Sequence, residues 1–210
     1  MKNIYRSIFA IVATVVISVN VQATPIHQAS SVTATTADFG GSFALVNMIN
    51  QSGLSAGYTS GVTDFTSYTG STTHNGLEGF SVGPDGQFSF DLGSALNIDG
   101  LALWASTNIG SLASFDLYAD TDQIWGNGVG SLLGSFNALG GVGSDPAQIF
   151  SFAATSTQFL HIDILSTQGG IGFQPGIGEI AFRGASEVPE PISIALLGLG
   201  LAGIGFSRKR

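Results

Sequence analysis

The amino-acid sequence predicts an all-β ectodomain, a jelly roll or β-sandwich, between an N-terminal signal peptide and a single C-terminal transmembrane helix. Two observations predict the β fold: apolar and polar residues alternate over several short segments, and turn-forming Gly, Asn and Asp separate these segments. A third observation, an apolar stretch at each end, sets residues 1–23 and 188–210 apart from a body of residues 24–187. That length suits one domain with a sizeable core.

The N-terminal segment has the three-part layout of a secretory signal peptide. Lys2 and Arg6 precede an apolar run over residues 8–19, and Val21-Gln22-Ala23 forms a small-x-small cleavage site. We therefore expect the chain to be exported and the mature body to start at residue 24.

Period-two alternation predicts strands in the second half of the body. The expected strands cover residues 88–92, 98–105, 115–119, 160–164 and 180–182. Asp99-Gly100 predicts a bulge or bend, and the alternation puts His161 on a polar side that we expect to face solvent. Earlier residues are less regular: 43–49 fit a strand or a short helical turn, and 52–79 fit a functional loop or unrecognised strands.

The composition of the body bounds its partners. Residues 24–187 contain ten Asp, three Glu and one Arg, with no Lys and no Cys, which gives a net charge of −12. We expect no nucleic-acid partner, because phosphate binding needs clustered cations. The acidic surface suits solubility outside the cell and weak binding of divalent cations.

The C-terminal segment combines a short motif, an apolar helix and a basic end. Val188, Pro189, Glu190 and Pro191 precede an apolar stretch over residues 192–206, and the chain closes with Arg208, Lys209 and Arg210. Such a helix spans about 22 Å, which is short for a hydrocarbon core of ~30 Å but can be accommodated by bilayer thinning. The terminal cations stay in the cytoplasm by the positive-inside rule.

This combination resembles the PEP-CTERM sorting signal of Gram-negative bacteria. The resemblance implies that exosortase, a membrane protease-transpeptidase, recognises Pro189-Glu190-Pro191 and removes the tail. We therefore expect transient anchoring in the inner membrane, followed by delivery to the cell surface or the extracellular space. The sorting signal leaves open what the body does.

Four segments of the body form a second recognisable pattern: Phe90-Asp91-Leu92-Gly93 before Ile98-Asp99-Gly100-Leu101, Phe115 to Asp120, Phe159 to Ile164, and Gly178 to Phe182. Their order resembles the discoidin-like, galactose-binding-like jelly roll of coagulation-factor C domains and bacterial carbohydrate-binding modules. The resemblance implies a structural calcium ion between an early Asp-bearing loop and a Glu in the last strand; we expect no other cofactor. Glu179 matches that Glu, but the early loop offers Asn50 instead of Asp, which weakens the site.

Motifs of catalytic type lack their structural context. Residues 53–57 and 79–83 both read Gly-x-Ser-x-Gly, but neither string lies between a strand and a helix, as a nucleophile elbow requires. The histidines show no metal-ligand spacing, and the closely spaced Asp116, Asp120 and Asp122 lack the EF-hand frame. We therefore expect no enzyme.

Two functions follow from these observations. The first is a non-catalytic surface or matrix protein that binds carbohydrate or exopolysaccharide, with four candidate contacts in loops: Tyr58, Tyr68, His74 and Trp125. Core or loop packing is the alternative role for these side chains. The second function is a secreted hydrolase acting on polysaccharide, which needs two carboxylates about 5–10 Å apart. The sequence singles out no such pair among the thirteen acids of the body.

Overall fold

The computed structural model describes residues 23–76, 78–81, 86–106, 110–127, 130–141, 144–170 and 174–186. The expected signal peptide and the C-terminal segment, with Val188 to Pro191 and Arg208 to Arg210, lie outside these residues. Within the described ranges, no helix has the length and apolar character needed to cross a membrane.

Strand structure dominates the described residues, which confirms the expected β-rich, sandwich-like fold. The strands are β1 (Ile26–His27), β2 (Ser31–Ala34), β3 (Thr73–His74), β4 (Gly79–Phe80), β5 (Gln87–Ala105), β6 (Leu112–Asp120), β7 (Ser131–Asn137), β8 (Asp145–Pro146), β9 (Gln148–Thr167) and β10 (Gly176–Gly184). The helices of these ranges are α1 (Phe65–Thr69) and two short 3-10 helices, η1 (Gly41–Phe43) and η2 (Leu45–Met48). The helical alternative is therefore correct for residues 43–49.

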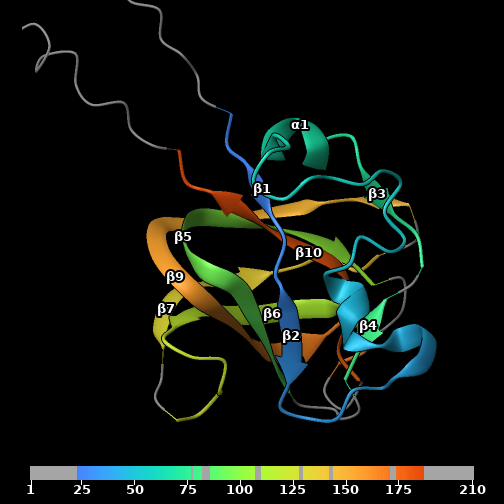
Figure 1. Cartoon of the computed structure of the whole chain (residues 1–210). Helices are drawn as coiled ribbons and strands as arrows, with labels where there is room; N and C mark the ends of the chain where they lie inside the picture. Colours follow the sequence, from blue (N-terminus) through green and yellow to red (C-terminus); the bar gives the residue numbers. More distant parts are fainter. Residues whose placement is uncertain are drawn as a thin grey trace, which may run out of the picture.

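Two long strands, β5 and β9, organise the main sheet. Its strands pair antiparallel in the order β1-β10-β5-β9-β6-β7, with β2 added to β5 and β4 to β10. The register between β5 and β9 shifts after Asp91 and again between Ile98 and Gly100. Both strands bend, and the sheet curls over on itself (Figure 1). The bulge expected at Asp99-Gly100 is confirmed, whereas the strands expected over 88–92 and 98–105 are one continuous strand.

The main hydrophobic core lies between the two halves of this curled sheet. Phe88 and Phe90 come from the first part of β5, Leu101 and Leu103 from its second part, and Phe182 from β10. The rings of Phe90 and Phe182 meet edge to face, with centroids 5.9 Å apart. Each fully buried side chain of this kind stabilises the fold by about 1.5–3 kcal/mol. Burial of these side chains therefore holds the two halves together.

A second hydrophobic cluster lies on the other side of the β10–β5 half, because side chains alternate between the two faces of a strand. Ala102, Trp104 and Ala181 form its floor, and the rings of Tyr58, Phe65 and Tyr68 cover them. The indole Nε1 of Trp104 donates to the Thr72 carbonyl at 3.0 Å. Much of the loop expected over residues 52–79 is thus a cover for the sheet, and it contains α1 and β3.

Candidate functional site

Three of the four side chains considered as ligand contacts lie in the interior. Tyr58 is 8%, Tyr68 7% and His74 1% exposed. The two tyrosine rings pack edge to face at 5.1 Å, and Tyr68 packs on Trp104 at 6.2 Å. His74 Nε2 lies 3.1 Å from the Ser52 carbonyl oxygen. The structure therefore favours the packing role for these three residues, because a buried ring offers no face to a ligand.

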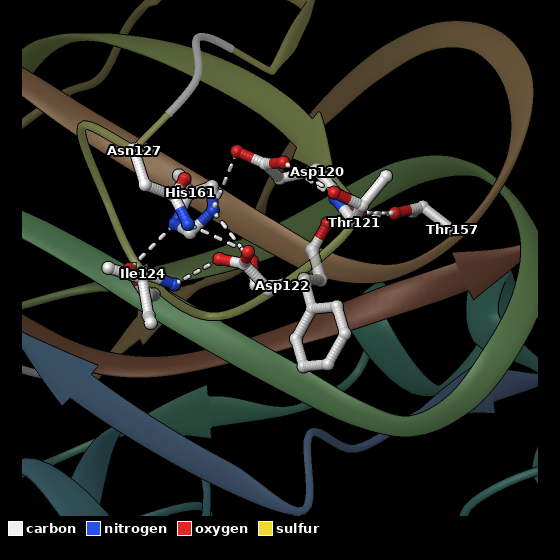
Figure 2. Close-up of polar contacts among 9 residues, drawn as sticks. Asp120, Thr121, Asp122, Ile124, Asn127, Thr157 and His161 are labelled. Atoms are coloured by element: carbon white, nitrogen blue, oxygen red, sulfur yellow. Dashed lines mark hydrogen bonds and ion pairs between the residues drawn. The ribbon is translucent and has the colours of Figure 1, made fainter.

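Trp125, the fourth candidate, is partly exposed on the turn of residues 121–127 that follows β6. Asp122 shapes this turn: one carboxylate oxygen accepts from Ile124 N at 2.8 Å, and the other accepts from Asn127 Nδ2 at 2.8 Å. These bonds, the first of them above all, hold the pKa of Asp122 below its ordinary value. Figure 2 shows the contacts of Asp122 with Ile124 and with His161. Hydrogen bonds within the turn therefore stabilise the segment that carries Trp125.

His161, on β9, packs against this turn (Figure 2). Its Nδ1 lies 2.6 Å from Ser89 Oγ on β5, and its Nε2 lies 3.2 Å from the Asp122 carbonyl and 3.4 Å from Asp120 Oδ2. The Trp125 ring lies edge-on to His161 at 5.4 Å and to Tyr118 at 5.4 Å. The expectation that His161 faces solvent is wrong. The alternation places its side chain on the correct, outer face of the strand, but the turn covers it completely, to 0% exposure.

Ser89, His161 and Asp120 contact one another in the order found in serine hydrolases. A nucleophile must reach its substrate, and Ser89 is only 3% exposed. His161, which would have to act as the base, is fully buried beneath the turn. These contacts therefore stabilise the fold, and they give no support to catalysis.

Two grooves lie beside the turn. The first, the Trp125 groove, has a volume of about 390 Å³ and is lined by Thr33, Ala34, Thr35, Ser89, Gln123, Ile124 and Trp125. The second, the Asp120 groove, has a volume of about 420 Å³ and is lined by Ala119, Asp120, Thr121, Gly130, Ser131, Thr155, Ser156 and Thr157. Hydroxyl and amide groups thus line the groove of a partly exposed indole, and the second groove adds a carboxylate. This is the chemistry that sugar hydroxyls and sugar ring faces require.

Sequence reasoning missed Ser89 and Gln123 as groove residues. Gln123 Nε2 donates to the Ser89 carbonyl at 3.1 Å and to Ser31 Oγ at 3.3 Å, which ties the turn to β5 and β2. The alternation around Ser89 could have placed it on the polar face of its strand. Nothing in the sequence shows that β2, β5 and the turn are neighbours.

The residues implied as calcium ligands fit a cation only in part. Glu179 is fully buried; its Oε2 accepts from Gln51 N at 2.9 Å, and its Oε1 has no hydrogen-bond partner among the described residues. Burial raises the pKa of Glu179 to about 9. The side-chain oxygen of Asn50 already accepts from Ser52 N at 2.9 Å. The described part of the chain holds no group of three His, Cys, Asp or Glu side chains arranged for a metal ion. The unpartnered Oε1 of Glu179 is therefore the main observation that fits a calcium site.

Comparison with protein families matches residues 187–210 to the PEP-CTERM protein-sorting motif. This confirms the expected sorting signal, which indicates export and a membrane-anchored C-terminus before sorting. No curated protein sequence matches the chain.

Solved structures match the body. The family 32 carbohydrate-binding module of NanJ from C. perfringens, in complex with galactose, has a TM-score of 0.51 at 15% identity, over 76% of this chain and 98% of that one. A second module of this family, from Clostridium perfringens in complex with GalNAc-β-1,3-galactose, has a TM-score of 0.50 at 14% identity. The match covers 77% of this chain and 99% of that one. Truncated AlyQ, with such a module and an alginate lyase domain, has a TM-score of 0.53 at 16% identity over 79% of this chain, which spans only 34% of AlyQ. These likenesses confirm the discoidin-like, galactose-binding-like fold.

Proposed function

We propose that the body is a non-catalytic carbohydrate-binding module that the PEP-CTERM signal and exosortase deliver to the cell surface or extracellular matrix. There it holds a glycan, such as the exopolysaccharide of the matrix, in the Trp125 groove. The carrying observation is the partly exposed Trp125, which lies beside the hydroxyl and amide groups of Thr33, Thr35 and Gln123. Aromatic rings bind the apolar faces of sugars, and neighbouring polar groups accept or donate hydrogen bonds to their hydroxyls.

The supports of Trp125 strengthen this proposal. The ring is held between Tyr118 and His161, and the turn is closed by the bonds of Asp122. A contact residue that is already ordered loses little conformational entropy when a ligand arrives. The groove is therefore pre-formed for binding.

The alternative, a polysaccharide hydrolase, has no comparable observation in its favour. In the Ser89–His161–Asp120 contacts, His161 is fully buried and Ser89 is 3% exposed, so no accessible nucleophile and base stand side by side. The binding function is therefore the better supported of the two.

The test compares Trp125→Ala with Phe39→Ala in the processed protein recovered from the producing cell. Phe39 is a matched control, since it is also a partly exposed aromatic residue and lines neither groove. Both proteins are applied to a glycan array and to affinity gels that contain the best polysaccharide. We expect Trp125→Ala to lose at least about tenfold in affinity, or 1.4 kcal/mol, and Phe39→Ala to retain it. Equal binding by the two variants, or no glycan bound by the parent protein, overturns the proposal.

A further inference from the structure

Positive charge is almost absent from the body, and the one cation is already paired. Arg183 is the single Lys or Arg of residues 24–187. Its Nε donates to Asp99 Oδ1 at 2.6 Å, and its Nη2 donates to the Asp99 carbonyl at 3.0 Å and to Ser151 Oγ at 3.1 Å. Arg183 lines neither groove. His161, the histidine beneath the turn, is fully buried and bonded. No described cationic side chain is therefore placed to meet an anionic ligand in either groove.

Negative charge, in contrast, lies at the end of β6 and within the turn that follows it. Asp120 lines its groove with a side chain that is 10% exposed. Its Oδ1 accepts from Thr121 N at 2.6 Å, whereas Oδ2 has His161 Nε2 at 3.4 Å and no hydrogen bond among the described residues. Asp122, one turn residue further on, has a lowered pKa and is ionised at neutral pH.

Gly130 packs closely against the end of β6 and the Asp120 carboxylate. A Cβ at this glycine would lie 3.1 Å from Asp120 Oδ2 and 2.4 Å from the Ala119 carbonyl oxygen. Any other residue would therefore crowd the wall of the Asp120 groove next to the carboxylate. The glycine therefore lets the groove wall pack close to Asp120, whose Oδ2 is buried without a hydrogen bond among the described residues.

We infer that the glycan recognised by the two grooves carries no anionic groups, and that free amino groups on it strengthen binding. This inference rests on the proposed function and adds the chemical class of its ligand. A uronate or sulfated polymer would bring its charges to Asp120, which lines one groove, and close to the turn that carries Asp122, without any described cation to compensate them. Like charges brought together at an interface oppose binding, whereas an ammonium group would be attracted to the same two carboxylates.

The net charge of the whole body also favours cationic over anionic ligands. A net charge of −12 over residues 24–187 repels polyanions at long range and attracts polycations, and both effects decrease as salt screens them. The affinity for an amino-sugar polymer should therefore fall with salt, and that for a neutral polymer should change little.

The experiment titrates the processed protein with three oligosaccharides of equal length: glucosamine, N-acetylglucosamine and glucuronate oligomers, at low and high salt. We expect affinity to decrease in that order. At low salt, the glucosamine oligomer should bind at least about tenfold more tightly than the glucuronate oligomer. Asp120→Asn and Asp122→Asn should each reduce the ratio of amino-sugar to neutral-sugar affinity. Asp64→Asn, a partly exposed Asp that caps the start of α1 and lines neither groove, is the matched charge control and should leave the ratio as it is.

The outcomes separate the two proposals. Glucuronate binding as tight as N-acetylglucosamine binding, or a ratio that Asp120→Asn, Asp122→Asn and Asp64→Asn change equally, overturns the charge selectivity alone. Loss of all three oligosaccharides in Trp125→Ala supports the groove as the site. If Trp125→Ala binds all three as the parent does, the proposed function itself fails.

Discussion

Ser89 Oγ and His161 Nδ1 lie 2.6 Å apart, although 72 residues separate them in the sequence, and together they form the floor beneath the turn of Trp125. We expect His161→Ala to lower the free energy of unfolding by about 2–4 kcal/mol, since it opens a cavity and leaves Ser89 without its partner. Glycan affinity should fall too, because Trp125 loses a supporting ring. Urea unfolding measures the loss of stability, and a titration followed by Trp fluorescence measures the loss of glycan affinity.

His27→Ala provides the control for the His161 variant, since His27 lies on β1 and lines neither groove. It should leave glycan affinity at the parent value. If His161→Ala binds glycan as the parent does, the imidazole is not a positioning residue for Trp125.

Glu179 should make stability depend on pH. Burial raises the pKa of Glu179 to about 9 in the folded protein, against 4.5 for an ordinary Glu. The folded state therefore holds the Glu179 proton more tightly than the unfolded state does. The stability that this proton contributes is fully present below pH 4.5 and is lost as pH rises through about 9. Urea midpoints across this window should fall as pH rises, and Glu179→Gln should flatten that fall. An undiminished slope in the Gln variant contradicts the assignment.

Calcium should bind weakly, through Glu179 and main-chain carbonyls near Asn50. A ligand that binds only the native state stabilises it by RT ln(1 + [L]/Kd), which is about 0.4 kcal/mol when calcium equals Kd. Asn50→Asp should enlarge the shift, because a carboxylate is a stronger calcium ligand than an amide. Calorimetric melting with and without millimolar calcium measures it. Unchanged midpoints in both proteins would remove the site.

Processing by exosortase should require Pro189 and Pro191. Each proline fixes its own φ and keeps the preceding residue out of the helical region, so the motif stays extended beside the membrane. Replacing both with Ala should let the tail helix extend toward Glu187 and leave an intact, membrane-held precursor. Immunoblots of membrane and released fractions detect this. Normal release of the double variant would show that the motif acts only as a linker.

Alternation in the sequence identifies strands and faces well, and it fails where another segment covers a face. It places Phe88, Phe90, Leu160 and Ile162 toward the core, as observed. For His161 it gives the correct face but the wrong exposure, because the covering turn belongs to a different part of the chain. Period-two patterns report which side of a strand is apolar, and they carry no information about which loop lies on the other side.

The candidate site shows the same limit. Trp125 could be named from the sequence because Trp in a polar turn is conspicuous. Tyr58 and Tyr68 look equally suitable, yet they cover Trp104 on the outer face of the sheet. The Trp125 groove joins residues from β2, β5 and the turn after β6, and that pairing depends on long-range register, which local sequence does not encode.

The position of β10 sets the order of events during secretion. This strand is the last of the described body, yet it is inserted between β1 and β5. If the N-terminus crosses the membrane first, as the expected signal peptide implies, the sheet cannot close until residue 184 has emerged. Because β5 and β9 also pair over long sequence separations, folding is slow relative to a fold with local contacts. Ala185 N donates to the Asn97 carbonyl at 2.8 Å, and the sorting motif starts at Val188. Translocation in that direction would deliver the final strand and the PEP-CTERM motif almost together.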